Sequence, residues 1–253
     1  MRYERMSRVV SLLLAPALAS CAYAEDPGHL RPLHNSLQAI SVTAQGWDSS
    51  TALLQAYERS RPDRSWQTVG NRIPVVVGRR GLAWGTGLHP SPPQKDPMKR
   101  EGDDRAPAGI FRLGSAFGDA DPEKMTWVRL PYRQTTANLL CIDDPSSAFY
   151  NRIIDQGQVK PDWKSHEDML RPDGQYRLGI VVEHNADPVI RGSGSCIFLH
   201  VWAGPGIGTS GCTAMAEEDL KNLLRWLAPS AHPAVVQLPA AVYSQYRAQW
   251  GLP

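Results

Sequence analysis

Cys212 and His200 are the two residues whose types and spacing could do chemistry. They lie twelve positions apart in GSGSCIFLHVWAGPGIGTSGCTAMAEEDL (residues 192–220), where an apolar run leads into a glycine-rich turn. Unperturbed pKa values of about 8.5 for cysteine and about 6.5 for histidine allow a thiolate and an imidazolium near neutral pH if the two groups are hydrogen-bonded. Cys212 would then be a nucleophile activated by His200, with backbone N–H groups around Gly211 and Cys212 facing an oxyanion. The structural alternative is a buried Cys212 and a core His200.

A strand, a glycine loop and a helix must position these two residues. The apolar run from Cys196 to Trp202 predicts a strand, and its alternation places His200 on the same face as Cys196. The glycines of the loop let the chain turn back so that Cys212 approaches the imidazole. A helix is predicted next, because leucines recur at helical spacing behind an acidic first turn. These leucines are Leu220, Leu223, Leu224 and Leu227.

Two classes of partner are disfavoured by the sequence. Gly206, Gly208 and Gly211 spell G-x-G-x-x-G between a strand and a helix, but a dinucleotide site also needs an acidic residue about 20 positions further on. No Asp or Glu follows Asp219, so no nucleotide cofactor is expected. Nucleic acid is disfavoured by charge: the chain's net +2 equals the +2 of residues 1–24, which leaves the remainder close to neutral.

The N-terminus predicts export. Three arginines precede an apolar run over residues 9–19, too short to span a bilayer, so residues 1–24 are interpreted as a signal peptide. Cleavage after AYA would release a secreted protein that begins at Glu25. LASC, a possible lipobox ending at Cys21, would instead give a lipoprotein. Either route leads to the periplasm or cell envelope, with membrane contact only through a lipid anchor.

An oxidising compartment changes how the cysteines are interpreted. The chain has Cys21, Cys141, Cys196 and Cys212, and three remain if Cys21 leaves with the signal or carries lipid. An odd count implies one free thiol. The preferred pairing is Cys141 with Cys196, which leaves Cys212 free. The alternative is that Cys196 is a second thiol on the His200 face.

The rest of the chain predicts a single, mainly β domain over residues 25–253 with a few peripheral helices. Residues 36–60 are expected to form a strand, a turn and a short helix, and residues 73–85 a hairpin around Gly78 to Gly81. Further strands are expected in IFRLGSAF, TWVRLPY and NLLCI, and short helical segments in SSAFYNRIID and at the start of WKSHEDM. Residues 86–109, rich in proline and charge, are expected to be a long loop.

Thr209, Ser210, Gly211 and Cys212, preceded by His200 on a strand, resemble the signature of the YkuD-type L,D-transpeptidase family, which is a strand histidine followed by Ser/Thr-His-Gly-Cys. RAPAGIF at residues 105–111 is similar to that family's Thr-Pro-x-Gly-x-Phe segment. The resemblance covers most of the chain from about residue 35. It implies a β-sandwich-like catalytic domain and an exported enzyme that needs no cofactor and acts on peptidoglycan stem peptides.

The resemblance also implies roles for the matching residues. Cys212 would attack the carbonyl that links the L-centre of meso-diaminopimelate to a terminal D-alanine, and an amine would resolve the thioacyl-enzyme into a crosslink. His200 matches the general base and acid, and Gly211 the glycine that contributes backbone geometry beside the nucleophile. Hydrolysis of the same peptides, as an L,D-carboxypeptidase or endopeptidase, uses the same acyl-enzyme. A non-catalytic peptidoglycan-binding domain is the alternative of a different class.

Two departures from the family pattern concern the substrate. Ser210 stands where a histidine is usual and is a candidate substrate-binding residue. Thr213 to Met215 replace the usual polar or basic residue after the cysteine, so the sequence offers no obvious residue there to bind a substrate carboxylate. His184, at a predicted strand end, could orient substrate or be a structural histidine. A zinc peptidase would need His184, His200 and a carboxylate, but no metal-ligand spacing occurs, so no metal is expected.

Overall fold

The computed structural model describes Met1, residues 31–92 and residues 95–253. The predicted signal peptide and the candidate lipobox, including Cys21, lie outside the described residues, as does the predicted start of the domain. Within the described ranges, no helix is both long enough and apolar enough to cross a bilayer.

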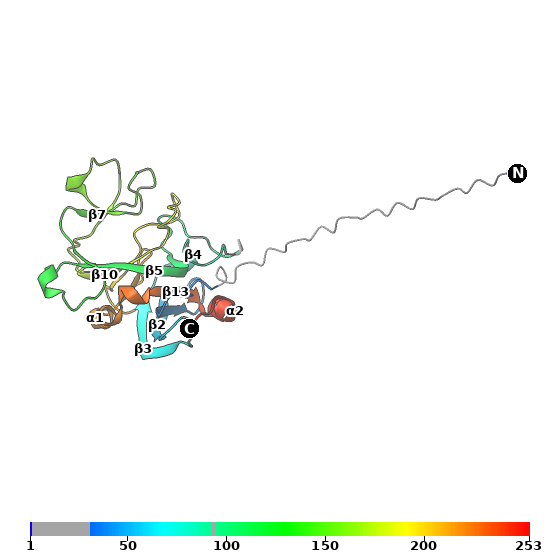
Figure 1. The fold of residues 1–253 in the computed structure, drawn as a ribbon. Helices are drawn as coiled ribbons and strands as arrows, with labels where there is room; N and C mark the ends of the chain where they lie inside the picture. Colours follow the sequence, from blue (N-terminus) through cyan, green and yellow to red (C-terminus); the bar gives the residue numbers. More distant parts are fainter. Residues whose placement is uncertain (2–30, 93–94) are drawn as a thin grey trace.

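A ten-stranded mixed sheet that closes on itself forms the core of the fold (Figure 1). Its spatial order is β10, β11, β12, β3, β2, β1, β13, β5 and β4, with β6 beside β5. The long strand β5 pairs with β13 and further along with β10, and this second pairing closes the ring. The mainly β fold predicted from the sequence is confirmed. The strand bounds are β1 (Gln38–Ala44), β2 (Thr51–Glu58), β3 (Gln67–Val76), β4 (Leu82–Trp84), β5 (Ala106–Gly118), β6 (Tyr132–Gln134), β10 (Leu178–Val182), β11 (Phe198–Val201), β12 (Thr213–Met215) and β13 (Ala234–Pro239).

A second sheet of three short strands, in the order β8, β7 and β9, lies between β6 and β10 in the sequence. Its strands are β7 (Leu139–Cys141), β8 (Ile153–Asp155) and β9 (Glu167–Asp168). Figure 1 shows this sheet, labelled at β7, standing away from β5 and β10 on the side opposite α1 and α2. Residues 139–168, which contain it, are called the cap below.

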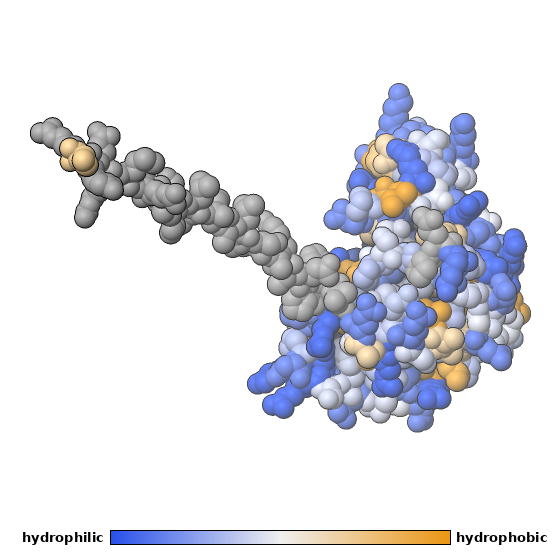
Figure 2. All heavy atoms as spheres, turned by 90° about the vertical axis from the view of Figure 1, so that its right-hand side faces the viewer, coloured by the Kyte–Doolittle hydropathy of each residue, from blue (hydrophilic) through white to orange (hydrophobic). Residues whose placement is uncertain are grey.

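Two α-helices cover the other side of the large sheet. They are α1 (Glu217–Trp226) and α2 (Ala240–Trp250), and single 3-10 turns occur at Pro122–Lys124, Gln156–Gln158 and Pro229–Ala231. Helix α1 begins with three acidic residues, which suit the positive end of a helix, and its leucines are buried against the core. This helix was predicted from its leucine spacing, and the prediction is confirmed. Figure 2 shows a mostly hydrophilic face with hydrophobic residues scattered over it, the usual pattern of a water-exposed surface.

Side-chain alternation along β11 divides the interior into two clusters. Ile197 and Leu199 belong to the main core inside the closed sheet. Cys196 and Phe198 face the other way and belong to a smaller cluster with Cys212 beneath the cap. The strand predicted over this segment, with alternating faces, is therefore confirmed, although its regular part is shorter.

Four predicted elements are wrong, and the first three lie in residues 51–58, TWVRLPY and WKSHEDM. Residues 51–58 form strand β2 and not a helix, because pairing on both sides with β1 and β3 outweighs the helical preference of Ala, Leu and Gln. TWVRLPY is a turn followed by the short strand β6. WKSHEDM contains strand β9, which pairs with β7.

The helix predicted in SSAFYNRIID is replaced by turns and strand β8. The Asp162 carboxylate accepts the backbone N–H of Ala148, and Asn151 has a left-handed φ of 61°, so helical backbone bonds cannot continue. Between β3 and β4, the Gly78–Gly81 turn forms as predicted, but the two strands pair with other partners beyond it.

Gly81 lies in a left-handed conformation where a side chain has no space. Its φ is 86°, and an added Cβ would lie 2.0 Å from the Trp47 carbonyl oxygen. We therefore expect Gly81→Ala to lower the free energy of unfolding by about 3 kcal/mol or more, from strain and backbone clash together. Urea denaturation measures this. Gly46→Ala is the control, because an added methyl there meets nothing within 4 Å; equal midpoints for the two variants would contradict the expectation.

Candidate active site

Strands β11 and β12 bring His200 and Cys212 to the wall of one pocket. The strands are parallel, with His200 paired to Ala214, and Cys212 immediately precedes β12. Both side chains line a cavity of about 470 Å³ under the cap, together with Ser210 and Gly211. Four residues proposed from the sequence for the site are therefore adjacent to this cavity. Among the described residues, no group of three or more His, Cys, Asp or Glu side chains could hold a metal ion.

The Cys212 thiol is buried and held by two backbone groups. The Phe198 N–H donates to its Sγ at 3.3 Å, and the thiol donates to the Cys196 carbonyl at 3.4 Å. Burial, and next the negative charge of Glu167, raise the pKa of Cys212 to about 12. The thiol is therefore neutral at neutral pH, and forming the thiolate requires a proton acceptor that acts directly on it.

His200 is oriented by its own backbone neighbour. Its Nδ1 lies 2.8 Å from the Val201 carbonyl oxygen. A carbonyl only accepts, so Nδ1 carries the proton and Nε2 has a free lone pair. Burial lowers the pKa of His200 to about 4. The imidazole is thus a neutral base at neutral pH, and within the described part of the chain no hydrogen bond joins it to Cys212.

Thr209 holds the turn that presents the cysteine. Its Oγ1 accepts the Gly211 N–H at 3.1 Å and donates to the Cys212 carbonyl at 2.6 Å. The loop is also fixed to the segment directly after β3, since the Thr209 N–H donates to the Val77 carbonyl and the Arg79 N–H donates to the Thr209 carbonyl. The Gly211 N–H is therefore already used by Thr209, and it could face an oxyanion only after that hydrogen bond breaks.

We expect Thr209→Val to lower the rate of Cys212 acylation about tenfold. Valine has nearly the same shape but loses both hydrogen bonds, each of which contributes about 1 kcal/mol. Thr209→Ser keeps the hydroxyl and should stay within about twofold of the wild type. Acylation is followed by intact mass after rapid denaturing quench. Equal rates for the valine and serine variants would show that this hydroxyl does not set the geometry.

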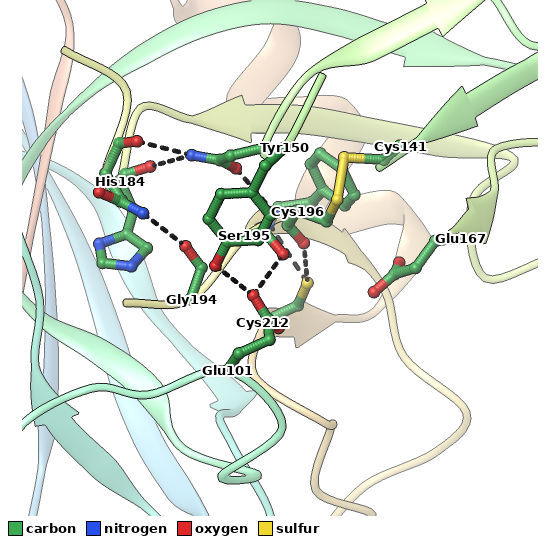
Figure 3. Close-up of a disulfide and its surroundings, with 12 residues drawn as sticks. Glu101, Cys141, Tyr150, Glu167, His184, Gly194, Ser195, Cys196 and Cys212 are labelled. Atoms are coloured by element: carbon green, nitrogen blue, oxygen red, sulfur yellow. Dashed lines mark hydrogen bonds between the residues drawn. A yellow bond between two sulfur atoms is a disulfide. The ribbon is translucent and has the colours of Figure 1, made fainter. Parts of the chain in front are cut away.

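The disulfide lies next to the nucleophile (Figure 3). Cys141 of β7 and Cys196 form it, with an S–S distance of 2.10 Å, which is the pairing preferred from the sequence, and Cys212 is free and buried. Cys196 has a left-handed φ of 56° and donates its N–H to the Asn151 side chain. Since the Cys196 carbonyl receives the Cys212 thiol, the disulfide connects the cap directly to the group that positions the nucleophile.

Residues 47–236 match the family model of YkuD, the L,D-transpeptidase catalytic domain, and this match identifies the family of the chain. The chain belongs to the YkuD family. Its members are cysteine-based L,D-transpeptidases of peptidoglycan, as the resemblance of the TSGC segment implied.

Other comparisons add little to the YkuD match. The chain is similar to the crystal structure of the helical cell shape determining protein Pgp2 from Campylobacter jejuni, at 13% sequence identity and a TM-score of 0.39. That alignment covers 83% of this chain and 56% of the Pgp2 chain. A search of the curated proteins found no match.

His184 is not among the residues that line the pocket of this YkuD domain, and its position fits the structural alternative given for it. Its ring is 2% exposed, its Nδ1 accepts the Thr86 N–H at 3.3 Å, and its Nε2 lies 2.9 Å from the Ser193 carbonyl. Both ring nitrogens are therefore used inside the protein. His184 is a structural histidine that joins two loops after β4 and β10.

Sequence reasoning missed several charged residues that line the YkuD pocket. Lys99 comes from the predicted long loop and is 3% exposed, with its Nζ on Asp103 at 2.5 Å. Arg171 follows the cap, pairs with Asp173 and is 36% exposed. Only the fold brings these distant cations beside Cys212, and no local pattern in the sequence distinguishes them from solvated charges.

Glu167 and Tyr176 are two more residues that sequence reasoning missed. The Tyr176 hydroxyl donates to Glu167 Oε2 at 2.5 Å, and the Tyr176 ring meets the His200 ring edge-on at 5.2 Å between centroids. Burial raises the pKa of Glu167. A carboxyl group hydrogen-bonded to a phenol beside a nucleophile would have marked both residues as candidates for the site. The sequence did not reveal this pair, because the segment that forms β9 was interpreted as the start of a helix.

Proposed function

We propose that this protein is an exported L,D-transpeptidase that forms peptidoglycan crosslinks through a thioacyl-enzyme on Cys212. One observation carries the proposal: Cys212 and His200 line the same pocket of a YkuD domain, and His200 has its proton on Nδ1, so that Nε2 is free to accept another. The periplasm or cell envelope as its location rests on the N-terminal sequence alone.

The reaction has two halves that share one covalent intermediate. In the first, the Cys212 sulfur attacks the carbonyl of the L,D-peptide bond, the C–N bond breaks, and the terminal D-amino acid leaves as an amine after gaining a proton. In the second, an acceptor amine attacks the thioester, loses a proton, and Cys212 leaves. His200, with Nε2 unprotonated, is the general base and acid that moves protons between these groups.

The pocket's cations supply a candidate for binding the stem-peptide carboxylates. Both cations are paired with an aspartate, but the Lys99 side chain is nearly inaccessible, whereas the Arg171 side chain is 36% exposed at the pocket wall. Arg171 is therefore proposed to contact a substrate carboxylate in place of the basic residue missing after Cys212. Ser210, exposed at the same pocket, is proposed to contact the peptide near the nucleophile.

Product analysis tests the proposed function. Purified protein is incubated with disaccharide-tetrapeptides, and products are separated and weighed. Crosslinked dimers are expected, and they should be absent with Cys212→Ala. Tripeptide monomers without dimers would show L,D-carboxypeptidase activity in place of transpeptidation. Monomers released from a crosslinked dimer substrate would indicate an endopeptidase. Binding without any product would leave only a peptidoglycan-binding domain.

A further inference from the structure

A second and larger cavity lies outside the active site, on the outer face of the closed sheet. Its volume is about 920 Å³, and it is lined by β1, β2, β3, α2 and the C-terminus, which lie side by side in Figure 1. Its floor includes Thr43, Leu53 and Pro74, which are paired across the three strands. Leu53 is 45% exposed, whereas its neighbour Leu54 is fully buried in the main core. This cavity is called the groove below.

Strand register places the groove on the same face of the sheet as His200. His200 in β11 pairs with Ala214 in β12, which pairs with Val76 in β3. Val76 in turn pairs with Thr51 in β2. Paired residues of neighbouring strands point to the same face of a sheet. Because Val76 and Thr51 line the groove and His200 lines the active-site cavity, the two cavities are neighbours on one outer face.

The loop between β11 and Cys212 forms a wall of both cavities. Trp202 and Pro205 line the groove. Ile207 and Gly208, a few positions further on, line the active-site cavity. A long substrate bound beside Cys212 can therefore continue over this loop into the groove.

The separation of the two cavities matches the length of a stem peptide. Strands β3 and β2 are the first and second neighbours of β12, so the groove begins about 5 to 10 Å from the strand that follows Cys212. In the proposed reaction three stem residues join the reacting carbonyl to the sugar, and three extended residues span about 10 Å. A stem peptide with its carbonyl at Cys212 therefore brings its glycan to the groove.

The side chains around the groove suit a carbohydrate. Four aromatic side chains in its wall are half-buried: Tyr57, Trp66, Trp202 and Tyr243. Aromatic rings pack against the C–H face of a sugar, while polar groups nearby bind its hydroxyl and amide substituents. Two of these rings are held in place, since Trp66 Nε1 donates to the Gly251 carbonyl at 3.2 Å and the Tyr243 hydroxyl to the Pro253 carbonyl at 2.5 Å.

The groove also carries unpaired positive charge. Arg72 and Arg247 line it, and none of its lining residues in the described ranges is acidic. The arginines that form ion pairs in this part of the chain are others. Both guanidinium groups can therefore donate hydrogen bonds to the oxygen atoms of a ligand.

Other kinds of occupant fit the groove less well. A peptide that joins a sheet needs an open strand edge, but β2 is paired on both sides, with β1 and β3. A membrane surface needs a broad apolar patch. The exposed Leu53 instead shares the groove with Thr51, Thr68 and Arg72.

We propose that the groove binds the glycan strand of peptidoglycan, a polymer of N-acetylated hexosamines, while a stem peptide of the same strand occupies the active-site cavity. This inference rests on the proposed function, because the stem peptide determines which polymer reaches the groove. The aromatic rings contact the C–H faces of the sugars, and Arg72 and Arg247 bind their polar substituents. Two linked contacts on one chain give polymeric peptidoglycan a higher affinity than a single stem peptide has.

Binding to glycan without peptides tests the groove separately from catalysis. The probes are peptidoglycan strands stripped of their stem peptides and the uncharged hexamer of N-acetylglucosamine, with binding measured by calorimetry. We expect both probes to bind the wild type. Trp202→Ala and Arg72→Ala should each weaken binding about tenfold, as is typical for the loss of a central aromatic or arginine contact. Thermal unfolding checks that each variant is folded, and Arg72→Ala, at an exposed position, tests the groove if Trp202→Ala is destabilised.

Trp163→Ala and Arg152→Ala are the matched controls. Trp163 is a half-buried tryptophan and Arg152 an exposed arginine, and both belong to the cap and not to the lining of the groove. Both variants should bind the two probes within about twofold of the wild type, because they remove the same kinds of side chain from another surface.

Three results would overturn glycan recognition. They are wild-type binding to neither probe, groove variants that bind as tightly as the wild type, and binding to the stripped strands alone that disappears at high salt. The last would mean that the arginines only attract the carboxylates exposed by stripping. A wild type that binds both probes but whose Cys212 is not acylated by tetrapeptides would instead contradict the proposed function and leave the groove as a glycan site.

Discussion

Cys212→Ser is expected to lower the rate of acyl-enzyme formation by at least about 10⁴-fold, because a serine hydroxyl is far less acidic than a thiol and no neighbour in this pocket is a strong enough base. The environment magnifies the loss: the side chain at this position is 6% exposed, and burial already raises the pKa of the thiol to about 12. Intact mass after incubation with tetrapeptides measures the rate.

The serine variant should keep its fold. Its hydroxyl can accept the Phe198 N–H and donate to the Cys196 carbonyl as the thiol does. A melting temperature close to that of the wild type is the control. An acylation rate within tenfold of the wild type would mean that another residue is the nucleophile.

A steep loss of stability between pH 7 and pH 5 is the second large effect expected. Three buried histidines, His89, His184 and His200, each have a pKa lowered to about 4, mainly by burial. In the unfolded chain their pKa is about 6.5, so below that pH the unfolded state binds more protons than the folded state. Stability is therefore complete above pH 6.5 and falls as the pH drops toward 4.

The size of this effect follows from the shift. Each histidine contributes about 2 kcal/mol between pH 7 and pH 5, so the three together contribute about 6 kcal/mol, a large share of the 5–15 kcal/mol typical of a folded domain. The raised pKa of Glu167 has the opposite sign, since it favours the folded state at low pH. One carboxyl reduces the slope but does not reverse it.

Urea denaturation at pH 5, 6 and 7 measures this loss. His184→Gln should reduce the difference between pH 7 and pH 5 by about a third, since it removes one of three similar contributions. His166→Gln is the surface control, as that side chain is 38% exposed. A free energy of unfolding that is flat or rises from pH 7 to pH 5 would contradict the burial of these histidines.

The sequence predicted the parts of the site that are local. His200 lies on a strand whose alternation is visible in seven residues, and Cys212 follows a glycine turn directly after it. Counting thiols in an oxidising compartment predicted one free cysteine, and the preferred pairing, Cys141 with Cys196, is the disulfide in the structure. These inferences need only short-range geometry and a residue count.

The parts that depend on long-range pairing were not predictable. Strand β2 carries residues that favour a helix, and only its neighbours β1 and β3 make it a strand. The closure of the sheet depends on β5 pairing with β13 along one part of its length and with β10 along the other, and the periodicity of the sequence does not predict strand partners. For the same reason, Glu167 and Lys99 are brought to Cys212 by the fold from segments 45 and 113 positions away in the sequence.

The most direct test of the central claim is to trap the acyl-enzyme and locate it. Protein mixed with a tetrapeptide substrate is quenched in acid within seconds, digested and mapped by mass. The account predicts a thioester on the peptide that contains Cys212, with the mass of the stem peptide less its terminal D-alanine. Turnover of substrate with no adduct, or with an adduct on any other residue, would contradict it.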